Sequence, residues 1–246
     1  MVRIYLYYDV DGWPYKVIPM HLVLKDVFPK DFEHLIVDSG VNKFFKYECR
    51  KEYPEWYLKA YPKVARQLTR EYGDSVWIVV PDYPDDYRPN RIPNNAELTL
   101  KNIIKFLSEY PDVNWLPVIQ ARWGEHGDFR RALLKYREVL GNPKRIAIGT
   151  LCTTAKLDYA LYCCRMARKF FPNSWIHVFG PRITWLKHIK HYINSFDSTA
   201  YCKVPWSLRK RANGSVSRKE AAFEFIRQAQ KYIGRVEPSK LLKTWT

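Results

Sequence analysis

Cysteine is scarce in this sequence, and the cysteines are not grouped. The 246 residues contain five, an odd number, with no CxxC pair and no Cys/His cluster at the spacing of a zinc site. This pattern argues against a disulfide framework and against a structural metal, and we expect no bound cofactor. Reduced thiols in a cytosolic compartment are the simpler interpretation.

Long hydrophobic runs are also missing. The densest apolar run, residues 76–81, has the length of a strand and falls far short of the ~18 residues of a membrane span. The first residues enter an alternating pattern directly, without the charged and apolar regions of a signal peptide. We therefore expect a soluble cytoplasmic protein with no membrane partner.

Acidic residues are too few to balance the basic ones. Twenty-five Asp and Glu stand against forty-one Lys and Arg, which gives a formal net charge of +16. Such an excess is self-repelling, and a polyanion relieves the repulsion while its own counterions are released. Nucleic acid is therefore the predicted partner. A solvated basic surface is the alternative that charge alone leaves open.

Apolar and aromatic residues are plentiful, at 47% and 16% of the chain, and predict a sizeable core. Short β-rich runs alternate with segments of helical periodicity, which predicts βαβ units and a parallel sheet. The β-rich runs are residues 4–8, 35–37, 76–80, 115–119, 146–148, 175–179 and 193–196. The helical segments are residues 54–72, 98–110, 128–140, 154–171, 181–191 and 217–234.

Local signals refine three of these helices. In the first, the spacing of four between Trp56, Ala60, Val64 and Leu68 marks one apolar face. Asp128 is the predicted N-cap of the third helix. The last helix is predicted to open with a capping box in residues 217–220, Ser-Arg-Lys-Glu.

The fold class depends on the ends of the strands. Seven runs are one short of a (β/α)8 barrel, and residues 17–24, apolar but interrupted by a proline, are the candidate for the missing strand. Periodicity alone also permits an open doubly wound sheet. However, six successive strands end in an aspartate, a glutamine or a glycine, and in a barrel these ends converge on one mouth. We predict a single (β/α)8 TIM-type barrel domain over residues 1–246, with an irregular or incomplete barrel as a variant and no zinc subdomain.

Three strand-end aspartates carry the candidate chemistry. Two carboxyl groups in one pocket permit a retaining displacement at C1′ of a nucleoside, in which one attacks the carbon and the other protonates the leaving group. Asp197, Asp38 and Asp82 are the candidates. Turn formation is the alternative role for Asp38 and Asp82, and helix capping is the alternative for Asp197.

Short motifs at these strand ends, in order over residues 35–214, resemble those of the tRNA-guanine transglycosylases and their DNA-modifying relatives, which adopt a (β/α)8 barrel. Residues 38–40 (DSG) are similar to the family's DSGG element, whose aspartate is a general acid/base. Residues 196–198 (FDS) are similar to its FDCV element, whose aspartate is the nucleophile. The resemblance therefore implies Asp197 as nucleophile and Asp38 as general acid/base.

Further motifs resemble the base-binding and loop elements of the same family. Residues 118–120 (VIQ), followed by 128–131 (DFRR), are similar to its IVQG…DLR stretch, and residues 147–151 (AIGTL) to its AIGGL turn. Residues 177–181 (HVFGP) resemble LMGVG-P, and residues 205–214 echo the PTRxGRNG loop. The base-binding residues that the resemblance implies are Asp82, Gln120, Gly149, Thr150, Ser39 and Gly40.

Two loops are candidates for contact with a nucleic-acid backbone. The first, residues 201–216, follows the implied nucleophile and interleaves aromatic with basic residues, a pattern suited to phosphate contacts and base stacking. The second follows Gln120. The predicted contact residues are Lys203, Arg209, Lys210, Arg211 and Arg122.

Several positions depart from the family pattern. Val41 and Asn42 replace a glycine and the aromatic that sandwiches the base, and Phe44 or Phe45 is the candidate replacement for that stacking. Ala121 and Thr150 each replace a glycine, which alters the predicted width of the pocket. The CxCxxC…H zinc motif of the tRNA enzymes does not occur in these residues, which favours the DNA-modifying branch, often encoded by viruses that act inside a host cell.

The resemblance thus implies a transglycosylase that exchanges guanine in DNA for a 7-deazaguanine base, such as 7-cyano-7-deazaguanine, through a glycosyl-aspartate intermediate. A tRNA-guanine transglycosylase is the close alternative. A non-catalytic nucleic-acid-binding barrel and an N-glycosidase that transfers the sugar to water are the others. A homodimer or a helper protein also remains open as a partner, because a barrel of this length leaves little binding surface of its own.

Overall fold

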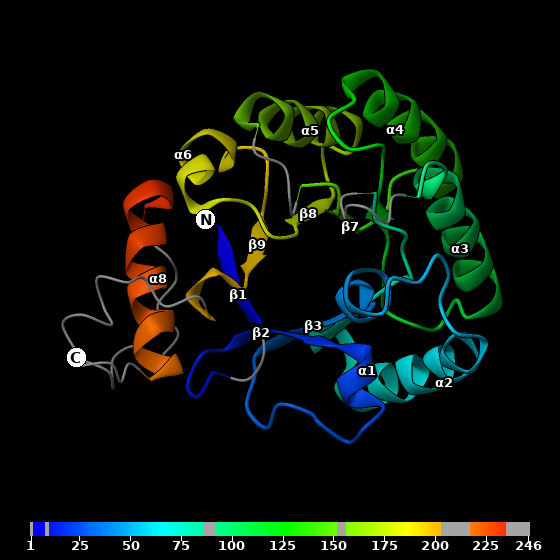
Figure 1. Cartoon of the computed structure of the whole chain (residues 1–246), viewed down its shortest axis with the longest axis horizontal. Helices are drawn as coiled ribbons and strands as arrows, with labels where there is room; N and C mark the ends of the chain where they lie inside the picture. Colours follow the sequence, from blue (N-terminus) through cyan, green and yellow to red (C-terminus); the bar gives the residue numbers. More distant parts are fainter. Residues whose placement is uncertain (1, 8–9, 86–91, 152–155, 203–216, 235–246) are drawn as a thin grey trace.

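A computed structural model describes residues 2–7, 10–85, 92–151, 156–202 and 217–234. Its strands all pair in parallel, and helices alternate with them along the chain and surround them in space (Figure 1). The strands are β1 (Arg3–Tyr7), β2 (Tyr15–Pro19), β3 (His34–Asp38), β4 (Val76–Val79), β5 (Trp115–Leu116), β6 (Val118–Ile119), β7 (Arg145–Ile148), β8 (Trp175–Val178) and β9 (Ser195–Ser198).

The two ends of the sheet are joined by one interrupted strand. The strand order is β5-β4-β3-β2-β1-β9-β8-β7-β6, and β5 and β6 are separated along the chain by Pro117 alone, which has no N–H for the ladder. The Leu116 carbonyl accepts from Val80 N at 3.2 Å, and the Pro117 carbonyl accepts from Ala147 N at 2.8 Å. The nine strands therefore occupy the eight positions of a nearly closed barrel. This confirms the predicted (β/α)8 TIM-type fold and places its irregularity at Pro117.

β2 is the strand that was missing from the seven β-rich runs. It was predicted within residues 17–24, and it lies at Tyr15–Pro19, followed at once by the short helix α1 (Met20–Val23). Pro19 is the last residue of the strand and lies opposite Asp38 in the register with β3. Because a proline at the end of a strand removes no central ladder bond, the strand tolerates it.

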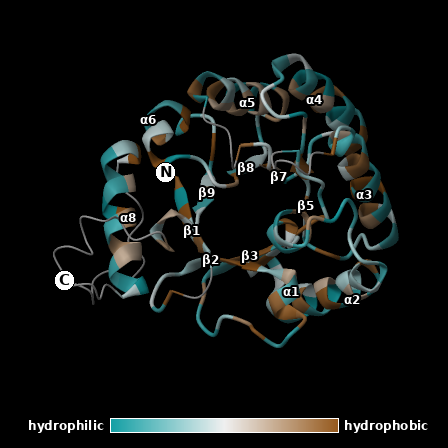
Figure 2. Cartoon of the chain, viewed as in Figure 1, coloured by the Kyte–Doolittle hydropathy of each residue, from teal (hydrophilic) through white to brown (hydrophobic). Residues whose placement is uncertain are grey.

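The outer ring consists of amphipathic helices, which alternate between hydrophilic and hydrophobic residues along their length (Figure 2). In the described part of the chain, none of these helices has both the length and the apolar character needed to cross a membrane. The longer helices are α2 (Glu55–Tyr72), α3 (Asn95–Glu109), α4 (His126–Leu140), α5 (Leu157–Phe170) and α8 (Arg218–Ile233).

The buried face of α2 includes the predicted Leu68, but its first turns are displaced by one residue from the predicted face. Tyr57 and Tyr61 are fully buried against the barrel, whereas Trp56 is 58% exposed. The two tyrosine hydroxyls donate to the carbonyls of Ser39 and Val79, at 2.8 and 2.7 Å. Because a buried tyrosine needs such a partner, this face depends on the neighbouring strands and is not visible in the helix sequence.

Helix ends differ from the predictions at three places. α3 begins at Asn95 and not at residue 98. α4 begins at His126, so Asp128 lies in its first turn and is not the N-cap. The predicted helix 181–191 is a 3₁₀ turn, Ile183–Trp185, followed by the short helix α6 (Leu186–Ile189). By contrast, the capping box that opens α8 is confirmed. The predicted start of α5, at residue 154, lies outside the described residues.

Aromatic and histidine side chains fill the barrel below its mouth. The Tyr5 hydroxyl lies 3.1 Å from His34 Nδ1, and the Tyr5 ring packs edge-on against His177 with centroids 5.5 Å apart. His34 in turn packs edge-on against Trp77 at 4.2 Å, and burial lowers the pKa of His34 to about 3. The interior of the barrel is therefore a packed core below its mouth.

Candidate active site

The carboxyl ends of the parallel strands carry the polar residues singled out from the sequence. Asp38 is the last residue of β3, and Asp197 is the third of the four residues of β9. Gln120 directly follows β6, Gly149 directly follows β7, and Asp82 lies in the loop after β4. All five line one cavity of about 520 Å³. The structure thus brings the three candidate aspartates to one place, at the end of the barrel where enzymes of this fold carry their active sites.

The wall of this cavity extends beyond the strand ends. The 3₁₀ turn after β9 contributes Tyr201, and the loop after β8 contributes Phe179 and Gly180. Helix α8 closes one side. The residues of α8 that line the cavity are Ala221, Glu224, Phe225 and Gln228.

Asp38 is a buried carboxyl group held by two donors. Its Oδ2 accepts a short hydrogen bond from the Tyr7 hydroxyl and a longer one, of 3.3 Å, from the backbone N–H of Gly40. Burial raises the pKa of Asp38 to about 7; the Tyr7 hydrogen bond opposes that rise, and the neighbouring Asp82 and Asp197 add to it. Asp38 can therefore either hold or release a proton near neutral pH, as a general acid/base requires.

Asp82 is the centre of a buried network. Ser39 Oγ donates to Asp82 Oδ1, and Gln120 Nε2 donates to Asp82 Oδ2 at 2.6 Å. Burial raises the pKa of Asp82, and these two hydrogen bonds act in the opposite direction. Among the described residues, Gln120 Oε1 is buried and has no hydrogen-bond partner. An unsatisfied buried acceptor is costly, so this oxygen is a candidate contact for a ligand.

Asp197 is almost fully buried, at 4% exposure, and is held at one oxygen. Oδ1 accepts the backbone N–H of Gly180 at 2.9 Å and lies 3.6 Å from Nε2 of His177. The backbone donor comes from the loop after the neighbouring strand, β8, so the barrel itself fixes the orientation of this carboxylate. Neither of these contacts, within the described part of the chain, involves Oδ2.

Three of the residues implied as base contacts lie behind the cavity wall. Ser39 acts through Asp82, and Thr150 Oγ1 donates to the carbonyl of Ala121 at 3.2 Å. Gly40 has a φ of +84°, and a Cβ there would lie 3.0 Å from the Tyr57 hydroxyl. These three residues do not line the cavity. Their contacts are with residues in the cavity wall or directly behind it.

Gly149 lines the cavity, but its backbone N–H is already bonded to the Ile119 carbonyl at 3.1 Å. The physical reason for a glycine here is the close approach of side chains from β6 and the residue after it. A Cβ on residue 149 would lie 2.8 Å from Gln120 Cδ and 2.8 Å from Val118 Cγ1. Glycine therefore makes room for the side chain that reaches Asp82.

Gly149→Ala is expected to lower the free energy of unfolding by about 1–3 kcal/mol, because the added methyl group displaces Gln120 from Asp82. Urea denaturation at constant pH measures the change. The matched control is Gly127→Ala on α4, where a Cβ meets only the flexible end of Arg131 at 3.6 Å. Equal stability of the two variants would contradict the close approach.

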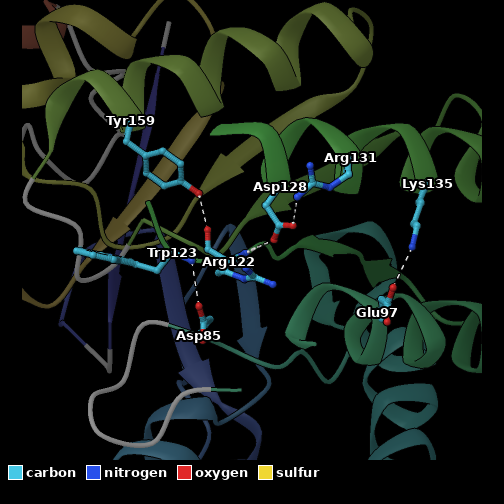
Figure 3. Close-up of polar contacts among 8 residues, drawn as sticks. All are labelled: Asp85, Glu97, Arg122, Trp123, Asp128, Arg131, Lys135 and Tyr159. Atoms are coloured by element: carbon cyan, nitrogen blue, oxygen red, sulfur yellow. Dashed lines mark hydrogen bonds and ion pairs between the residues drawn. The ribbon is translucent and has the colours of Figure 1, made fainter. Parts of the chain in front are cut away.

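The loop after Gln120 is fixed by three side chains from three different elements (Figure 3). The backbone N–H of Arg122 donates to Asp128 at 2.9 Å, and the Tyr159 hydroxyl donates to the Arg122 carbonyl at 3.3 Å. The next N–H, that of Trp123, donates to Asp85 at 3.1 Å. Arg122 is exposed on this anchored backbone, a placement compatible with its predicted contact with phosphate.

The basic residues predicted to track a nucleic-acid backbone, Lys203, Arg209, Lys210 and Arg211, lie outside the described residues. Both flanks of their segment are nevertheless placed. On one side Thr199, Ala200 and Tyr201 line the cavity, and on the other side α8 lines it.

The predicted stacking role of Phe44 or Phe45 has no support in the structure. Both rings are buried, at 1% and 0% exposure, pack against Tyr53 and do not line the cavity. The aromatic rings that do line it are those of Tyr7, Phe179, Tyr201 and Phe225.

Tyr7 and His177 contact the two candidate catalytic carboxylates and were not singled out from the sequence. A usable signal existed for Tyr7, because the period of two along β1 places Tyr5 and Tyr7 on one face of the strand. For His177, the strand assignment gave no indication of which groups its ring would meet.

Comparisons with known proteins do not identify the chain. No protein-family model matches it, and neither does any curated protein. Among the residues that the structure describes, no group of three or more His, Cys, Asp and Glu side chains is arranged to hold a metal ion.

Proposed function

We propose that this protein is a transglycosylase that exchanges guanine in nucleic acid for a 7-deazaguanine base, with DNA as the first substrate and tRNA as the alternative. The observation that carries the proposal is the pairing of two differently held carboxyl groups in one cavity. Asp38 has a pKa raised to about 7, and Asp197 is fixed at Oδ1 by a backbone N–H. Such a pair divides acid and nucleophile roles between two groups.

The proposed reaction has two displacements. In the first, Asp197 Oδ2 bonds to C1′ as the bond from C1′ to guanine N9 breaks, and the proton of Asp38 passes to the departing base. In the second, Asp38 takes the N9 proton of the incoming base as N9 bonds to C1′ and the ester oxygen of Asp197 departs. Atoms and charges balance, and both carboxyl groups return to their starting states.

The same cavity supplies acceptors for the base. Guanine presents the N1–H and the N2 amino group as donors along its Watson–Crick edge. Gln120 Oε1 has no donor among the residues that the structure describes, and each oxygen of Asp82 retains acceptor capacity beyond the one hydrogen bond that it receives there from a side chain. A base with two adjacent donors satisfies these oxygens. Adenine, which presents an acceptor at N1, does not.

Nucleic acid as the carrier of that base is supported by charge and placement. The net charge is +16, and the basic segment 203–216 is flanked on both sides by residues of the cavity wall. Because the cavity is recessed at the barrel mouth, the target nucleotide must leave its stack to enter. A single strand, a loop or a flipped base is therefore the expected substrate form.

The test is incubation of the protein with single-stranded DNA or tRNA and with labelled guanine or labelled 7-cyano-7-deazaguanine. Transfer of label into DNA is the expected result. Transfer into tRNA alone would move the substrate to the alternative. Release of free guanine without incorporation would indicate an N-glycosidase. A folded protein that binds both polymers and labels neither would refute the proposal and favour a non-catalytic nucleic-acid-binding barrel.

A further inference from the structure

His177 lies on β8 with a fully buried side chain that faces the barrel interior beside Asp197. β8 and β9 pair so that His177 is opposite Ser195, and Ser195 and Asp197, two residues apart, face the same side of β9. The imidazole spans the two. Nδ1 lies 2.9 Å from Ser195 Oγ, and Nε2 lies 3.6 Å from Asp197 Oδ1.

The hydrogen bonds around Ser195 and the carboxylate of Asp197 together favour a proton on Nε2 of His177. The indole N–H of Trp175 can only donate, and it donates to Ser195 Oγ at 2.8 Å. The Trp175 bond occupies one acceptor site of Ser195 Oγ and leaves its hydroxyl proton available to Nδ1 of His177, an arrangement in which the imidazole proton lies on Nε2. The reverse tautomer would set the Nε2 lone pair against a carboxylate oxygen, a repulsive contact.

The Nε2 donor is not yet used. In the described part of the chain this buried nitrogen has no hydrogen-bond partner, and 3.6 Å is too long for one. The acceptor at that distance, Oδ1 of Asp197, already receives the N–H of Gly180. A small movement of the carboxylate would complete the bond, as happens when catalytic contacts tighten on substrate binding.

We propose that His177 is a positioning residue for Asp197, donating from Nε2 to Oδ1 so that Oδ2 is the oxygen that attacks C1′. The role rests on the proposed base exchange. When Oδ2 bonds to C1′, Oδ1 becomes the carbonyl oxygen of the ester, and the proton stays on His177 throughout. When the ester bond breaks, the same donor stabilises the charge that returns to the carboxylate.

Two amide substitutions separate the two ring nitrogens. The side-chain amide of His177→Gln reaches the position of Nε2 and can still donate to Asp197, whereas that of His177→Asn reaches only the position of Nδ1, beside Ser195. We expect His177→Asn to lower kcat for label transfer about 10- to 100-fold with KM for the nucleic acid unchanged, the loss typical of one hydrogen bond to a charged group. We expect His177→Gln to retain most of the rate. Equal rates for the two variants, at equal thermal stability, would overturn the proposal.

A second measurement does not depend on activity. In ¹⁵N-histidine-labelled protein, with the His177 signals assigned by their loss in His177→Gln, we expect a proton on Nε2 whose resonance moves in Asp197→Asn. Nε2 without a proton, or a resonance indifferent to Asp197→Asn, would overturn the contact even in an active enzyme. Absence of label transfer by the wild-type protein would instead refute the base-exchange reaction, so the two failures are distinguishable.

Discussion

Asp197→Asn is expected to abolish base exchange, with a loss on the order of 10³-fold or more in label transfer. An amide cannot form the glycosyl ester with C1′, whereas its oxygen can still accept the Gly180 N–H that the carboxylate accepts at 2.9 Å. The variant should therefore fold with the cavity intact and lose only the covalent step. Because the substitution is isosteric, packing around residue 197 is preserved.

Two readouts check this loss. Label transfer gives the rate, and a denaturing gel of protein incubated with DNA in the absence of an incoming base detects the covalent adduct, which we expect in the wild type and not in Asp197→Asn. Asp112→Asn is the control, since Asp112 lies in the loop before β5 and not at the carboxyl ends of the strands. Its carboxylate pairs with Arg66 at 2.7 Å. Full activity of Asp197→Asn would transfer the nucleophile role to Asp38 or Asp82.

The sequence predicted the features of this site that follow from local periodicity. Alternating strands and helices imply a parallel sheet, a parallel sheet aligns the carboxyl ends of its strands, and a barrel gathers those ends at one mouth. This reasoning was sufficient to place Asp38, Asp82, Gln120 and Asp197 in one cavity. The eighth strand was located only in part: residues 17–24 were the candidate, and the strand is Tyr15–Pro19, with the proline at its end, where it is tolerated.

The sequence could not predict which hydrogen-bond partners the polar side chains would find through tertiary contacts. The first turns of the buried face of α2 were misplaced because Tyr57 and Tyr61 become core residues only through the carbonyls of Ser39 and Val79. Asp128 resembles an N-cap in sequence, yet its carboxylate is used by the backbone of Arg122. In each case a polar atom is satisfied by a group far along the chain, a relation that hydropathy and spacing do not record.

Asp38→Asn has two expected effects of opposite sign. Base exchange should fall roughly 10²–10⁴-fold, because the amide can neither protonate the leaving base nor accept the proton of the incoming one. Stability above neutral pH should rise, because burial of the Asp38 carboxyl raises its pKa to about 7 and its ionised form is therefore disfavoured in the folded protein.

The pH window of the stability effect follows from the two pKa values. In the unfolded chain the carboxyl titrates near its ordinary 3.8, and in the folded protein it titrates near 7. Between these values the folded protein holds a proton that the unfolded chain has released, so the free energy of unfolding falls as pH rises. Below this window both states are protonated and the cost is absent; above it the cost is complete. Asp38→Asn lacks the titration and should lack this fall.

Thermal unfolding of both proteins from pH 4 to pH 9 measures the difference, which should grow from about pH 4 and level off above about pH 7. Asp82 is buried in both proteins, so its contribution to the pH dependence of stability cancels in the difference between them. Tyr7→Phe provides a second variant: it removes the hydrogen bond that opposes the rise in the pKa of Asp38, so the fall in stability should extend to higher pH than in the wild type. If the difference in stability between the wild type and Asp38→Asn does not vary with pH, Asp38 is an ordinary carboxylate. Asp82, which is buried and has a raised pKa, would then become the candidate acid.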